Sequence, residues 1–139
     1  MSGYAKFAVA VALLAAGAEV ALGWATAEAW APQGSPLLLA FLAGPLVFLS
    51  LLAWRRRDHP ARSWLLFRLA AVLATLGLAI LAFDFVRFRK EPPGQHAPHT
   101  HPLIVPLVQW LAVLAVWITL VVKEGREKRA KEAEQVAAK

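Results

Sequence analysis

Four long apolar stretches constrain this chain more than any other feature of its sequence. They cover residues 7–28, 37–54, 64–86 and 103–122. A helix needs about 20 residues to cross the roughly 30 Å hydrocarbon layer of a bilayer, so each stretch is long enough to span it. The chain is also 59% apolar, which is too hydrophobic for a water-facing surface. We therefore predict an all-α integral membrane protein with four membrane-spanning helices.

The loops between these stretches are short, so successive helices are antiparallel neighbours. This predicts an up-down-up-down four-helix bundle over residues 1–122. Lys and Arg accumulate in cytoplasmic loops. Here they gather in segment 123–139 and in the second loop, at Arg55, Arg56, Arg57 and Arg62. We expect both termini on the cytoplasmic side of a bacterial or archaeal inner membrane, with 123–139 forming a charged helical tail.

The basic residues lie beside the spans, where they orient helices and attract anionic lipid headgroups. The four arginines of the second loop are our candidates for headgroup contact. The net charge of +6 thus indicates membrane lipids as partners and no nucleic acid.

The chain has no cysteine and no asparagine, and its one methionine is Met1. Lack of cysteine excludes thiolate metal sites, iron–sulfur clusters and thiol nucleophiles. No histidine lies in a span, so we expect no haem and no other cofactor. No nucleophile, base and oxyanion donor converge in the sequence, and we predict a protein without enzymatic activity. Depletion of thermolabile residues indicates a thermophilic source.

Glu19 lies near the centre of the first span. An ionised side chain at that depth costs at least about 2.5 to 3.5 kcal/mol, so a polar neighbour is required. The other spans hold few polar side chains. We therefore expect Glu19 to contact another subunit or to handle protons.

A carboxyl group in the first helix of a short four-span protein resembles one feature of the small multidrug resistance transporters. The resemblance covers Ala18-Glu19-Val20 alone. It implies a homodimeric transporter in which Glu19 couples protons to cations, and this is one alternative function.

A second polar group is expected at the outer membrane boundary, where it would contact a partner or a proton. It comprises Glu28, Asp84, Arg87 and Arg89, with Gln109 in the same layer. Asp84 and Arg87 are one helical turn apart, which predicts an interfacial ion pair.

Small residues recur every four positions in the first span, at Ala8, Ala12 and Ala16 and, on the adjoining row, at Gly17, Ala21 and Ala25. Such rows let helices approach closely in lipid, so we expect this helix to be the most buried of the four. In the second span, Pro45 removes one backbone hydrogen bond and frees the carbonyl of Phe41. A bend is expected there, and a neighbouring helix must satisfy that carbonyl.

The third loop contains His96, His99 and His101 among four prolines. Imidazole binds Zn²⁺, Cu²⁺ and Ni²⁺, so a metal-binding protein of the outer face is a further alternative.

Taken with Glu19 and the small-residue rows, these features favour a non-catalytic accessory or assembly subunit. We expect its partners to be larger integral membrane subunits of an energy-transducing complex, such as a respiratory cytochrome bc-type or oxidase complex. A homo-oligomer is also compatible with the sequence.

Overall fold

The computed structural model describes residues 3–26, 36–92 and 101–138, which form four long helices. They are α1 (Gly3–Ala25), α3 (Pro36–Arg55), α4 (Pro60–Lys90) and α5 (His101–Ala137). Each is long and apolar enough to cross a membrane. The structure thus confirms the prediction of an all-α, multi-pass membrane protein.

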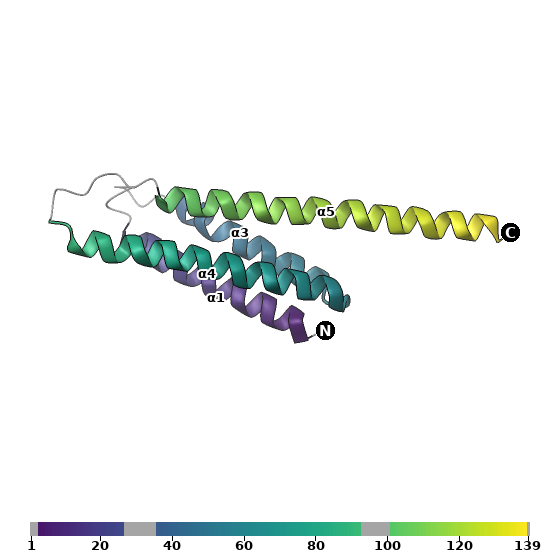
Figure 1. Ribbon diagram of the computed structural model, residues 1–139, viewed down its shortest axis with the longest axis horizontal. Helices are drawn as coiled ribbons and strands as arrows, with labels where there is room; N and C mark the ends of the chain where they lie inside the picture. The colour runs from purple at the N-terminus through teal and green to yellow at the C-terminus, as the bar shows by residue number, and fades with distance from the viewer. Residues whose placement is uncertain (1–2, 27–35, 93–100, 139) are drawn as a thin grey trace.

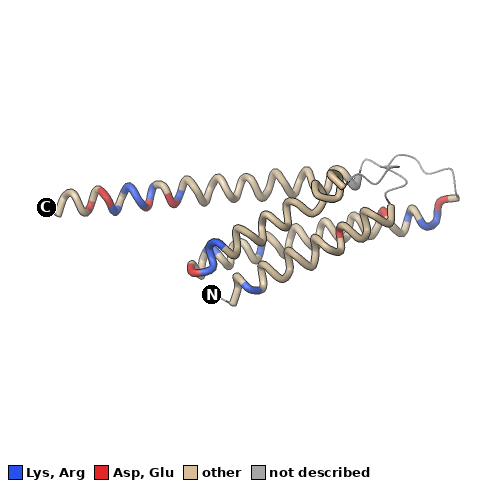
Figure 2. The backbone as a smooth tube through the Cα atoms, turned by 180° about the vertical axis from the view of Figure 1, so that it is seen from behind, with Lys and Arg blue, Asp and Glu red and all other residues tan. Residues whose placement is uncertain are grey.

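The helices run alternately in opposite directions, and both chain ends lie at the same end of the bundle (Figure 1). Two helices are longer than the apolar stretches that predict them. α4 continues past the apolar stretch to Lys90, and α5 continues without a break to Ala137. The charged segment after residue 122 is therefore a direct extension of the fourth helix, and it projects away from the other three (Figure 2).

α1 and α5 each pack against both α3 and α4. The contact face of α1 is a stripe of small residues interrupted by one carboxyl group. Its buried members are Ala5, Ala8, Ala12, Ala15, Ala16, Glu19 and Gly23. Small side chains allow the close approach of backbones that drives association in lipid.

One of the two predicted rows of small residues is buried and the other is not. Ala8, Ala12 and Ala16 are in the core, as expected, but the row that begins at Gly17 faces outward. The inward stripe advances by three and four residues in turn, which rotates that row away from α3 and α4. This helix packs most extensively against its neighbours, as expected, although the buried share of its apolar stretch, 33%, is slightly below the 39% of α3.

Gly44 and Pro45 of α3 form the contact surface for the Trp110 side chain of α5. Trp110 Nε1 donates a hydrogen bond of 3.3 Å to the carbonyl of Phe41, which is the group that Pro45 frees. A Cβ atom on Gly44 would lie 2.7 Å from the indole ring, so only glycine leaves room for it. α3 remains one continuous helix through Pro45 because its neighbour supplies the missing donor.

Candidate functional site

A buried carboxyl–amide pair joins α1 to α5 in the interior of the bundle. Gln109 Nε2 donates a hydrogen bond of 2.7 Å to Glu19 Oε1 and lies 3.4 Å from the carbonyl oxygen of Leu73 on α4. The Glu19 side chain is fully enclosed, with 0% exposure, and Gln109 is 2% exposed. Three helices therefore meet at one polar contact.

Gly77 makes room for this pair. A Cβ atom at that position would collide with Glu19 Oε1 and with Gln109 Nε2. Gly77 lies on the inward face of α4, at the point where the two side chains cross it. The glycine is thus a steric requirement of the polar contact.

The pair also leaves two complementary atoms open. Glu19 Oε2 and Gln109 Oε1 have no hydrogen-bond partner among the described residues. A carboxylic acid supplies one hydroxyl donor and an amide oxygen is an acceptor, so the two open atoms are chemically complementary when Glu19 is protonated. We expected too few polar neighbours for Glu19 within the chain, whereas the structure supplies one, Gln109, 90 positions away.

Asp84 is the second buried carboxyl group, and its surroundings differ. It lies near the C-terminal end of α4, on the face turned toward the other helices, and is 5% exposed. Its Oδ2 has no hydrogen-bond partner among the described residues. The side chain borders a groove of about 260 Å³ that is otherwise lined by Ala79, Ile80 and Phe83. Because Ile80 and Phe83 are exposed, this groove opens on the outward side of α4.

The ion pair expected between Asp84 and Arg87 is not formed. Arg87 Nε instead donates to Glu91 Oε1 at 3.2 Å, one turn farther along α4. Arg87 is half exposed, and a long cationic side chain at a span end reaches toward water, which draws it away from the membrane and from Asp84. Arg89 lies over the ring of Phe85. Glu28 is outside the described residues.

At the opposite end of the bundle, two arginines of the second loop hold α5. Arg56 donates to both carboxylate oxygens of Glu124, at 2.9 and 3.3 Å. Arg62 donates to Glu124 Oε1 at 3.0 Å and to Glu127 Oε2 at 2.6 Å. The hydrogen bond from Arg62, with its charge, lowers the pKa of Glu127 below its usual value. We call these four residues the arginine clamp.

All four loop arginines were predicted to contact lipid headgroups. Arg55 is exposed, and Arg57 lies over the ring of Trp54, so both are placed at the surface. Arg56 and Arg62 form ion pairs with Glu124 on α5, and Arg62 also lines a cleft beside them. The sequence contains a pattern that could have predicted these ion pairs. Glu124 and Glu127 are one turn apart, just beyond a span that ends on the same side as the arginine-rich loop.

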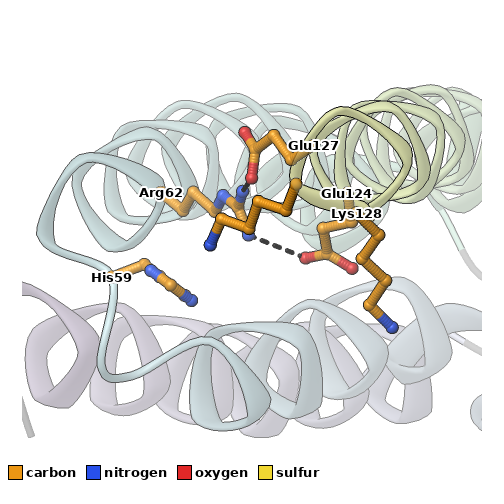
Figure 3. A pocket seen from close by; sticks show the side chains of 6 residues that line it. His59, Arg62, Glu124, Glu127 and Lys128 are labelled. Carbon is orange, nitrogen blue, oxygen red and sulfur yellow. Dashed lines mark hydrogen bonds and ion pairs between the residues drawn. The ribbon is translucent and has the colours of Figure 1, made fainter. Parts of the chain in front are cut away.

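A polar cleft of about 250 Å³ opens beside the arginine clamp, between the start of α4 and the extension of α5. Figure 3 shows the His59 ring and the Arg62 side chain on one side, with Glu124, Glu127 and Lys128 from α5 on the other. Lys131 completes the lining.

The proposed metal ligands cannot be assessed from this fold. His96 and His99 lie outside the described residues, as does the side chain of His101. Within residues 3–26, 36–92 and 103–138, no group of three potential ligands is placed to hold a metal ion. The metal-binding and transporter hypotheses both stay predictions.

Searches against protein families, curated proteins and solved structures find no match to this chain. The geometry of its own residues therefore carries the functional argument.

Proposed function

We propose that this chain is a non-catalytic accessory or assembly subunit that docks onto a larger integral membrane protein through the outer half of α4. The observation that carries the proposal is Asp84, whose carboxyl group is buried at a span end and has an unpartnered oxygen beside an exposed apolar groove. A buried polar atom without a partner is costly, and a docked helix with a donor at that depth would remove the cost.

Glu19 does not support docking in the same way. Its hydrogen bond to Gln109 is internal, so the requirement for a foreign partner moves from Glu19 to Asp84. The partner expected at Asp84 is a transmembrane helix that presents Lys, Arg, His or an amide or hydroxyl group. Apolar side chains of that helix would fill the groove beside Ile80 and Phe83.

The extension of α5 offers a second contact outside the membrane. From Gly125 to Ala138, every residue is exposed. Charges of both signs cover it, and it has no apolar stripe that would fold back on the bundle. We further propose that the host complex is energy-transducing, for example respiratory. That part rests on how common small multi-span subunits are in such complexes and on no particular residue.

Site-specific photo-crosslinking in native membranes tests the proposal. A photoreactive amino acid at Phe83, beside the groove, should crosslink to one defined membrane protein. The matched position is Leu14, which is 75% exposed on α1, and it should not yield that product. Absence of a defined product at Phe83, or a product with twice the mass of this chain, would overturn docking onto a different protein.

The partner should also depend on the carboxyl group itself. Asp84→Leu should lose the partner during purification in mild detergent. Ser50→Ala should retain it, because the Ser50 hydroxyl bonds only to the carbonyl of Val47 in its own helix. Equal recovery of the partner with both variants would contradict the role given to Asp84.

A further inference from the structure

The cleft beside the arginine clamp has the lining and the position of a phosphate-binding site. Its cationic side chains come from two separate elements: Arg62 from the start of α4, and Lys128 and Lys131 from the extension of α5. His59 adds an imidazole to the lining, and Figure 3 shows its ring on the same side of the cleft as Arg62. None of these elements alone would surround a ligand.

The two carboxylates in the lining, Glu124 and Glu127, already form ion pairs with arginines. Glu124 accepts hydrogen bonds from Arg56 and Arg62, and Glu127 accepts one from Arg62. Their negative charges are therefore matched by the two arginines of the clamp. Lys128 and Lys131 are exposed, and among the described residues neither forms an ion pair with these glutamates, so they supply the net positive charge of the cleft.

The start of α4 adds further donors. His59 occupies the N-cap position without a side-chain cap, and Pro60 follows it. The first backbone hydrogen bond of the helix runs from Ser63 N to His59 O. The amides of Ala61 and Arg62 therefore precede the bonded ladder, and the positive end of the helix dipole points the same way.

The membrane end of the cleft lies at the level of the lipid headgroups, and its far end extends beyond them. The apolar part of α5 ends at Val122, so Glu124 lies about 3 Å and Lys131 about 14 Å beyond it at 1.5 Å per residue. Headgroups extend roughly 5 to 8 Å beyond the hydrocarbon on each side. Trp54 and Trp64, both exposed near this end, mark the same level.

We propose that this cleft binds an anionic phosphate, with a phospholipid headgroup of the cytoplasmic leaflet as its source. Basic pockets between transmembrane helices on the cytoplasmic side are typical sites for anionic lipids. The ligand would bridge the start of α4 and the extension of α5. It would thereby reinforce the arginine clamp, independently of any docking at Asp84.

Lipid titration of the detergent-purified full chain, followed by native mass spectrometry, tests this assignment. Phosphatidylglycerol should bind in preference to phosphatidylcholine. The double variant Lys128→Gln/Lys131→Gln should weaken phosphatidylglycerol binding by about tenfold. The control, Arg126→Gln/Arg129→Gln, removes the same charge from exposed positions of the same helix that do not line the cleft, and it should lose less than about threefold.

Equal losses in the two double variants would overturn the proposal, because they indicate a diffuse attraction to the whole extension. Equal binding of the two lipids would also overturn it. Millimolar inorganic phosphate separates the sources: displacement of the lipid shows that the cleft accepts the free anion too, whereas no displacement shows that it requires the lipid. Matching far-UV circular dichroism melts verify that all variants are folded.

Discussion

Glu19 and Asp84 are carboxyl groups buried in one bundle, yet the fold treats them differently. Glu19 is enclosed between three helices and accepts a hydrogen bond from Gln109, with Gly77 clearing the space. Asp84 is nearly as buried, but its Oδ2 is unpartnered among the described residues, and the residue borders an open groove. The comparison teaches that burial alone does not assign a role to an intramembrane acid. The role depends on whether the same chain supplies the partner.

The largest effect is expected at the glycine that accommodates Glu19. Gly77→Ala should lower the free energy of unfolding by about 2 to 3 kcal/mol, because the methyl group collides with both members of the pair. Gly17→Ala is the matched control, since a Cβ there meets nothing within 4 Å. It should be neutral or stabilise the helix by up to about 1 kcal/mol. Unfolding in mixed micelles measures both.

Removing the partner of Glu19 should have the next largest effect. Gln109→Leu should cost about 1 to 2 kcal/mol of unfolding free energy, since interhelical hydrogen bonds in membranes contribute about 0.6 and up to about 1.7 kcal/mol. Glu19→Gln preserves shape and hydrogen bonding and should change stability by less than about 0.5 kcal/mol. A larger loss for Glu19→Gln than for Gln109→Leu would show that the pair needs a carboxyl group.

The same kind of change at Asp84 should leave the isolated chain intact. Asp84→Leu removes an unpartnered polar group, so the purified protein should be as stable as the wild type or more stable by about 1 kcal/mol. A loss of about 2 kcal/mol or more in the same unfolding assay would show that Asp84 has an internal partner. Asp84 would then belong in the same class as Glu19.

The smallest effect concerns a carboxyl group outside the membrane. The pKa of Glu127 is lowered by Arg62, so its contribution is fully present above the unfolded value of about 4.3 and is lost as the pH falls through the lower folded value. Wild-type melting temperature should therefore fall slightly more on acidification than that of Glu127→Gln. Glu134→Gln, at an exposed position of the same helix, should behave like the wild type.

The spans could be predicted from the sequence because apolar length and the placement of Lys and Arg are local properties. The contacts between helices could not, because they depend on how far each helix is rotated and shifted along its axis. Gln109 was recognisable as a buried polar residue, but its pairing with Glu19 requires α1 and α5 to be in register. The exposure of Gly17 could not be predicted for the same reason, because it depends on the rotation of α1 about its axis. The ion pairs of Arg56 and Arg62 with α5 were not predicted, because their acceptors lie on a helix more than 60 positions away.

The helix that supplies Gln109 also supplies Trp110, and this has a consequence for biosynthesis. Two polar groups in earlier helices, the carboxyl of Glu19 and the carbonyl of Phe41, find their donors only on α5. A ribosome makes α5 after the other three helices. Until α5 enters the bilayer, the nascent protein carries two unmet polar groups in α1 and α3, so insertion of α5 satisfies the earlier helices as well as adding one more.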